Sequence, residues 1–193
     1  MDQIATQRGS RSGAGQLDAA LDFARDAHQG QLRKQNGRPY IEHPVAVEEL
    51  LAARGFNGTL LVAAYLHDTV EKTEVELTEI ERRFGSEVAE IVASLSEDDS
   101  IATYAERKRH LRAQALAAGR EATIVYAADR LCNLRDWHEL NAEERHAAAE
   151  RLDTTYDERV LLWGEDLEAL TELDSEPPFL EDVELELRAL RSG

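Results

Sequence analysis

Positively charged residues, cysteine and aromatic side chains are all scarce in this chain. Of its 193 residues, 22 are lysine or arginine and 39 are aspartate or glutamate, which gives a formal net charge of -17. Phosphate-rich partners need a positive surface, so this balance argues against a general DNA, RNA or anionic-membrane binder. It leaves room for a local basic pocket, because screening limits electrostatic effects to about 8 Å at physiological salt.

The sequence also lacks a long hydrophobic run and a second cysteine. Cys132 is the single cysteine, so no intrachain disulfide can form, and we expect the chain in a reducing compartment, the cytoplasm. No apolar segment approaches the roughly 20 residues of a membrane helix. Residues 1–16, rich in glycine, serine and arginine, predict a disordered tail and not a signal peptide.

Apolar residues recur at helical spacing along the rest of the chain, and no segment has the alternation of a convincing strand. We therefore predict an all-α fold, a single-domain helical bundle over residues 17–175. Residues 142–173 predict one long helix or two, and the prolines at 177–178 end this region. Residues 176–193 are predicted to form an acidic C-terminal extension, whose short amphipathic helix could dock or fray.

The most informative stretch covers residues 60–73. Seven apolar residues, 60–66, lead directly to His67 and Asp68, and Glu71 follows one helical turn later. A helix this apolar is buried, and polar groups at its end need partners because an unpaired buried charge is costly. A metal ion is the partner that best suits an adjacent histidine and aspartate.

Further candidate ligands lie on other predicted helices or helix ends, namely His28, His43 and Asp129. In a helical bundle, inward-facing side chains from several helices can meet at one centre. A mixture of imidazole and carboxylate ligands favours Mn, Fe, Co or Zn over Ca or Mg. Taken singly, each histidine could equally be a solvated or hydrogen-bonded residue, and a His-Asp dipeptide alone is a weak motif.

An ordered set of motifs closely resembles the HD-domain hydrolases of guanosine tetra- and pentaphosphate, which include the hydrolase half of RelA/SpoT-type enzymes and the small stand-alone alarmone hydrolases. The matching segments are AHQGQ at 27–31, RK at 33–34, PYIEHP at 39–44, HDTVE at 67–71 and ADRLCNLR at 128–135. The resemblance covers residues 17–137, with the motifs in matching order and spacing. It implies that the bundle over residues 17–175 is of the HD-domain type. The residues after 137 are too few for a synthetase domain, so we expect hydrolysis only.

The resemblance also implies roles for individual residues. One metal ion, usually Mn²⁺ in the family, would be bound by His43, His67, Asp68 and Asp129. Glu71, followed by Lys72, would act on the attacking water as base or orienter. Substrate contacts would come from Arg33, Lys34, Asn133, Arg107 and Lys108, for which the alternatives are solvated charges and a structural amide.

The chain departs from the family at Lys72, where an aspartate usually follows the glutamate. A cation there could remove half of the water-activating pair, or it could contact phosphate and change the accepted substrate. Three functions remain open: removal of the 3′-diphosphate of ppGpp to give GDP or GTP and pyrophosphate, hydrolysis of another phosphorylated nucleotide such as an NADPH-like 2′-phosphate, and a catalytically weakened metal- and nucleotide-binding module. The expected partner is a guanosine polyphosphate, with no DNA, RNA or membrane, and the oligomeric state is open.

Overall fold

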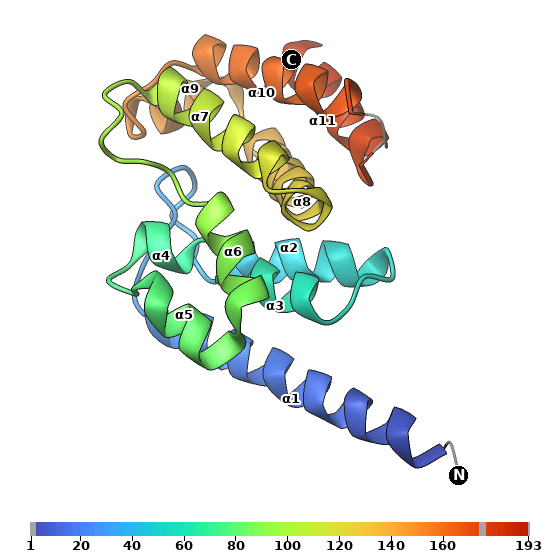
Figure 1. Ribbon diagram of the computed structural model, residues 1–193. Helices are drawn as coiled ribbons and strands as arrows, with labels where there is room; N and C mark the ends of the chain where they lie inside the picture. The colour runs from blue at the N-terminus through green and yellow to red at the C-terminus, as the bar shows by residue number, and fades with distance from the viewer. Residues whose placement is uncertain (1–2, 174–176, 193) are drawn as a thin grey trace.

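The computed structural model describes residues 3–173 and 177–192, and its regular elements in these residues are helices (Figure 1). They are α1 (Gln3–Ala27), α2 (Glu42–Ala53), α3 (Thr59–Leu66), α4 (Thr69–Lys72), α5 (Leu77–Phe84), α6 (Ser86–Ser94), α7 (Tyr104–Ala117), α8 (Arg120–His138), α9 (Ala142–Glu150), α10 (Tyr156–Thr171) and α11 (Leu180–Ser192). The prediction of an all-α fold is confirmed. Over the same residues, no helix combines the length and hydrophobicity needed to cross a membrane.

The two helices with the most informative motifs, α3 and α8, lie at the centre of the bundle. α3 packs against α1, α2, α6 and α8, while α8 packs against α2, α3, α6, α7 and α11. In Figure 1, α8 lies between α2 and α3 on one side and α7, α10 and α11 on the other. Residues 61–66 of α3 and most of α8 are buried, so polar side chains on these helices are held inside the protein.

The N-terminal segment differs from the expected disordered tail over residues 1–16. Helix α1 begins at Gln3, and no proline interrupts it before Ala27. Glycine in a helix interior costs only about 1 kcal/mol relative to alanine, so the glycines of this segment do not end the helix. The N-terminal half of α1 projects beyond the other helices in Figure 1, whereas Ala20 and Ala24 in the second half are fully buried. Met1 and Asp2 lie outside the described residues.

The segment 142–173 divides into two helices, α9 and α10. The helical conformation is interrupted between them, where Asp153 has a positive φ of 55°. The Thr155 hydroxyl then caps α10 by accepting a hydrogen bond of 3.1 Å from the Glu158 N–H. After Pro177 and Pro178, α11 docks on α8 and α10 through the buried residues Val183, Leu187 and Leu190. The expected boundary at residue 175 lies outside the described residues.

Candidate metal centre and active-site cleft

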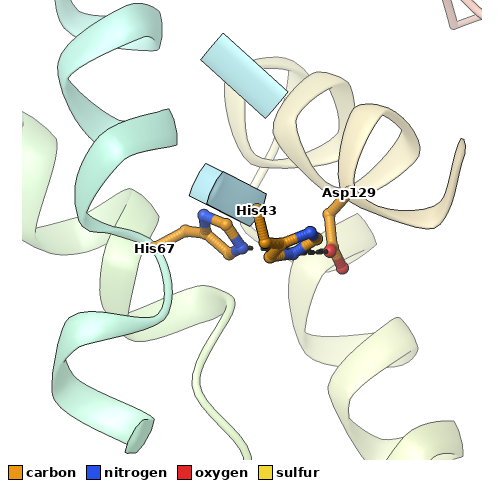
Figure 2. Close-up of side chains that lie close together, drawn as sticks. All are labelled: His43, His67 and Asp129. Atoms are coloured by element: carbon orange, nitrogen blue, oxygen red, sulfur yellow. Dashed lines mark hydrogen bonds and ion pairs between the residues drawn. The ribbon is translucent and has the colours of Figure 1, made fainter. Parts of the chain in front are cut away.

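Three buried side chains from three separate elements converge inside the bundle (Figure 2). His43 comes from the first turn of α2, His67 follows α3, and Asp129 lies in the middle of α8. One potential ligand atom from each residue lies within 4.8 Å of the other two. The Asp129 Oδ1 atom is 2.9 Å from His43 Nε2 and 3.8 Å from His67 Nε2, so both imidazoles face the same carboxylate oxygen.

Asp68 joins this group from the residue after His67. Its Oδ2 atom lies 3.4 Å from His67 Nε2 and 3.7 Å from His43 Nε2. The same oxygen accepts a hydrogen bond of 2.7 Å from the Tyr40 hydroxyl, which holds the carboxylate toward the two histidines. The structure therefore brings together all four residues predicted as metal ligands.

The donor atoms of this cluster fit a divalent transition metal. His67 Nδ1 donates to the Ala64 carbonyl oxygen at 2.8 Å, which leaves the lone pair of His67 Nε2 facing the centre. That buried Nε2 atom has no hydrogen-bond partner among the described residues. Two imidazoles and two carboxylates form a mixed nitrogen and oxygen set of the kind that Mn, Fe, Co and Zn accept.

The electrostatics of the cluster keep its groups in the protonation states that a metal needs. Burial lowers the pKa of His43 below 6.5, so this imidazole is neutral at pH 7. Burial alone would raise the pKa of Asp68, but the facing His67 and His43 bring it below its ordinary value. Burial would also raise the pKa of Asp129. The positive charge of Arg130 outweighs this effect and holds the pKa of the Asp129 carboxyl well below its ordinary range.

Asp129 is fixed by neighbours on both of its oxygen atoms. Asn133 Nδ2 donates to Oδ1 at 2.6 Å, and Arg130 Nε donates to Oδ2 at 3.2 Å. The Asn133 amide oxygen in turn accepts a 2.8 Å hydrogen bond from Arg33 Nη2, and Arg33 Nη1 lies 3.1 Å from Asp136. Asn133 thus connects Arg33, in the loop before α2, to a predicted metal ligand.

Glu71 and Lys72 lie on α4, directly after the His-Asp pair. Glu71 Oε2 accepts a hydrogen bond of 3.1 Å from the backbone N–H of Glu97, and Lys72 Nζ contacts Glu71 Oε1. Burial opposes the charged form of Lys72, but Glu71 and Asp68 raise the pKa of the ammonium above 10.5. The lysine therefore stays positively charged against the carboxylate predicted to act on water.

The predicted substrate-contacting residues line one cleft of about 370 Å³ together with His43, Asp68 and Asp129 of the candidate metal cluster. The cleft also contains Arg107 and Lys108, which share one carboxylate: Arg107 Nε lies 3.2 Å from Glu97 Oε2, and Lys108 Nζ contacts Glu97 Oε1. Polar and charged residues dominate the wall of this cleft. They include Gln31, Arg33, Lys34, Tyr40, His43, Asp68, Glu71, Lys72, Glu97, Tyr104, Arg107, Lys108, Asp129, Arg130, Asn133 and Arg159.

Among the residues of this cleft that had no predicted role are Tyr40, Glu97, Arg130 and Arg159. Tyr40 belongs to the PYIEHP segment, and Arg130 directly follows Asp129, so their positions in motifs gave a signal. Glu97 lies in the polar loop before α7 and Arg159 on α10, where nothing in the local sequence distinguishes them from solvated charges.

A profile of the HD domain matches residues 20–158 of this chain. The chain belongs to the HD-domain family of guanosine-3′,5′-bis(diphosphate) 3′-pyrophosphohydrolases. Members with curated sequences include the enzyme named guanosine-3′,5′-bis(diphosphate) 3′-pyrophosphohydrolase MESH1 from Mus musculus, which is 41% identical over 128 residues, 65% of this chain and 71% of the relative. The Homo sapiens protein of the same name is 40% identical over 68% of this chain and 75% of its own length.

Two solved structures have a similar fold. One was described as a metazoan ortholog of SpoT that hydrolyzes ppGpp and plays a role in starvation responses. It matches 92% of this chain and 94% of its own, with a TM-score of 0.71 and 25% identity. Another, lmo0812 from Listeria monocytogenes EGD-e, matches 80% of this chain and 99% of its own, with a TM-score of 0.67 and 30% identity. The expected HD-type bundle is therefore confirmed.

Proposed function

We propose that this chain is a metal-dependent pyrophosphohydrolase that removes the 3′-diphosphate of guanosine tetra- and pentaphosphate and yields pyrophosphate with GDP or GTP. The observation that carries the proposal is the convergence of His43, His67, Asp68 and Asp129 beside the cleft. The buried His67 Nε2 atom of this cluster lacks a partner among the described residues. The names of the MESH1 relatives and of the SpoT ortholog supply the substrate. We place the reaction in the cytoplasm, with a free nucleotide and no nucleic acid as the partner.

The four clustered side chains would hold one divalent ion, for which we propose Mn²⁺. Bound there, such an ion supplies Lewis acidity toward a phosphoryl oxygen and toward the attacking water. A neutral His43 imidazole and ionised Asp68 and Asp129 carboxylates are the states that the pKa shifts of these three residues favour. Tyr40 and Asn133 would keep the two carboxylates aimed at the ion through their hydrogen bonds.

Glu71 is the group that we assign to the attacking water. Its carboxylate lies one helical turn after the His-Asp pair, and the Glu97 N–H fixes one of its oxygens. In the proposed step the carboxylate accepts a proton from water. The water oxygen bonds to the phosphorus next to O3′ as the P–O3′ bond breaks, and O3′ takes up a proton. Pyrophosphate and a 3′-hydroxyl result.

The cations of the cleft would receive the phosphates and the base. Arg33 is 6% exposed and held by Asn133 and Asp136, so its guanidinium has a fixed position for stacking or hydrogen bonding. Arg107 and Lys108 together carry two positive charges against the single charge of Glu97, so this wall keeps a net positive charge for phosphate. Lys34, which is exposed in the loop before α2, would act as a point charge at the rim.

The contact between Lys72 and Glu71 favours one alternative function, a module that binds metal and nucleotide with little turnover. The Lys72 ammonium group contacts one oxygen of the Glu71 carboxylate, so that oxygen is less available to accept a proton from water. The rate of ppGpp turnover therefore distinguishes the pyrophosphohydrolase from the binding module.

The test is product analysis with full-length, Mn²⁺-loaded protein. We expect ppGpp to yield GDP and pyrophosphate in equal amounts on anion-exchange chromatography. Parallel reactions with NADPH and with other 2′- or 3′-phosphorylated nucleotides measure selectivity. Phosphate release from NADPH without cleavage of ppGpp would contradict the proposal, and binding of ppGpp without products would favour the module.

A further inference from the structure

Arg159, on α10, is a buried cation without an acidic partner in the described part of the chain. Its side chain is 9% exposed, and its Nε atom has no hydrogen-bond partner among the described residues. Other buried arginines around the cleft are paired: Arg33 with Asp136, and Arg130 with Asp129. Arg145 on α9 is likewise buried without a carboxylate, but its guanidinium donates to the backbone carbonyl oxygens of Trp137 and His138.

Aromatic rings and one hydroxyl hold the Arg159 guanidinium in place. Its Cζ atom lies 4.4 Å from the ring centre of Trp137, 5.1 Å from that of Trp163 and 5.4 Å from that of Tyr104. Its Nη1 atom donates a hydrogen bond of 2.5 Å to the Tyr104 hydroxyl. These contacts fix the plane of the guanidinium, but they return only part of the cost of removing a cation from water. The charge is left available for an anion.

Arg159 lines the same cleft as His43, Asp68 and Asp129. Two lysines of this cleft contact carboxylates of the chain: Lys72 contacts Glu71, and Lys108 contacts Glu97. Among the buried arginines of the cleft wall, Arg159 is thus the one whose charge the described carboxylates leave unpaired. It also lies just beyond residues 20–158, the segment that the HD-domain profile matches.

We propose that Arg159 binds a phosphate group of the nucleotide, with Tyr104 as the residue that orients its guanidinium. A guanidinium can give two parallel N–H donors to one phosphate, and the unpartnered Nε provides one of them. The inference rests on the proposed function and adds a substrate-binding residue from α10 to those that the motifs supply.

The test compares two buried arginines in the full-length chain. Arg145 on α9 is 8% exposed and lies over the Tyr156 ring, but it donates to the Trp137 carbonyl oxygen at 3.1 Å and does not line the cleft. Arg159→Met and Arg145→Met are each titrated with inorganic pyrophosphate by calorimetry without added divalent ion, and the Tm of each unliganded variant is measured. Arg159→Lys is the conservative variant, because it keeps the positive charge but lacks the two parallel N–H donors of the guanidinium.

We expect Arg159→Met to raise the Kd for pyrophosphate at least about tenfold, with an unchanged or higher Tm, because an apolar side chain replaces an unpaired charge. Arg159→Lys should lie between Arg159→Met and the wild type in affinity. Arg145→Met should lower the Tm and leave the Kd unchanged. An unchanged Kd in Arg159→Met, or wild-type protein that does not bind pyrophosphate, would overturn the inference and indicate a structural arginine.

Failure of the proposed function has a different signature. If the chain binds pyrophosphate through Arg159 but does not cleave ppGpp, the phosphate-binding role stands and the hydrolase assignment fails. If ppGpp is cleaved and Arg159→Met leaves both KM and the pyrophosphate Kd unchanged, the hydrolase assignment stands and the role of Arg159 fails.

Discussion

Asn133 donates a hydrogen bond of 2.6 Å to the Asp129 Oδ1 atom, the same oxygen that lies 2.9 Å from His43 Nε2. We expect Asn133→Leu, which has similar volume and no donor, to weaken Mn²⁺ binding by about 10–100-fold, because groups that orient a metal ligand contribute on this scale. Isothermal titration calorimetry with Mn²⁺ measures the change.

Asn141 provides the control for this variant. It caps α9 by accepting a hydrogen bond of 3.0 Å from the Glu144 N–H, on an element that carries no predicted ligand. Asn141→Ala should cost about 1 kcal/mol of stability and leave Mn²⁺ affinity unchanged. Equal Mn²⁺ affinity in Asn133→Leu and the wild type would show that Asn133 does not position Asp129.

Asp166 on α10 connects α8, which carries the predicted ligand Asp129, to the C-terminal part of the bundle. Its Oδ1 atom accepts hydrogen bonds from the Tyr126 hydroxyl at 2.8 Å and from Arg112 Nη1 at 2.7 Å, and its Oδ2 atom lies 3.8 Å from Arg130 Nη1. Asp166→Ala should lower the free energy of unfolding by about 1–3 kcal/mol in urea titrations, because it leaves the buried Tyr126 hydroxyl without its acceptor and removes one of the two carboxylates that contact Arg112.

The neighbouring Glu165 makes a matched comparison. It pairs with Arg109 and Arg112 nearer to the surface, with a side chain that is 25% exposed. Glu165→Ala should therefore cost about 1 kcal/mol or less. An equal loss in the free energy of unfolding in Asp166→Ala and Glu165→Ala would show that the buried contacts of Asp166 stabilise the protein no more than the more exposed contacts of Glu165.

Lys72 should limit turnover through its contact with Glu71. We expect Lys72→Asp to raise kcat for ppGpp by about tenfold or more, because it frees the Glu71 carboxylate and adds a second proton acceptor. Lys72→Met, which removes the ammonium without adding a carboxylate, should give a smaller increase. Steady-state kinetics decides the point: a higher KM in both variants without a gain in kcat would make Lys72 a substrate-binding residue.

His28 should make the stability of the metal-free protein depend on pH. Burial lowers its pKa below 6.5, although the hydrogen bond with Gln31 acts in the opposite direction. Below pH 6.5 the unfolded chain takes up a proton that the folded chain does not, so the free energy of unfolding falls as the pH decreases from that value toward the folded pKa. The slope from one histidine is at most about 1.4 kcal/mol per pH unit.

The variant His28→Gln removes this titration. Its unfolding free energy, measured in urea between about pH 7 and 5, should vary less with pH than that of the wild type. If the free energy of unfolding changes equally with pH in the wild type and in His28→Gln, His28 does not contribute to the pH dependence.

The metal cluster could be predicted from the sequence because its residues stand at the ends or in the middle of strongly apolar helices. The buried run before His67 implied that the adjacent carboxylate and imidazole face the interior, and the structure brings His43 and Asp129 to the same point. Helical spacing also predicted the all-α fold, with two helices as one option for residues 142–173.

Contacts between distant helices could not be predicted, because spacing defines the buried face of a helix and not the residue that faces it. Arg107 and Lys108 were expected to meet phosphate, and the structure pairs both with Glu97 from the preceding loop. The roles of Arg159 and Asp166 depend on how α10 packs near α7 and α8, and their local sequence is that of an ordinary charged helix. The start of α1 was missed because a segment rich in glycine and serine has weak helix propensity.

Pyrophosphate release from ppGpp by the Mn²⁺-loaded protein tests the central claim most directly. The account predicts release by the wild type, loss of release after chelation with EDTA and recovery when Mn²⁺ is restored. Asp68→Ala should reduce the rate by at least about 100-fold, since this carboxylate faces both histidines. Equal release by the wild type and Asp68→Ala, or no release by wild-type protein with Mn²⁺ bound, would contradict it.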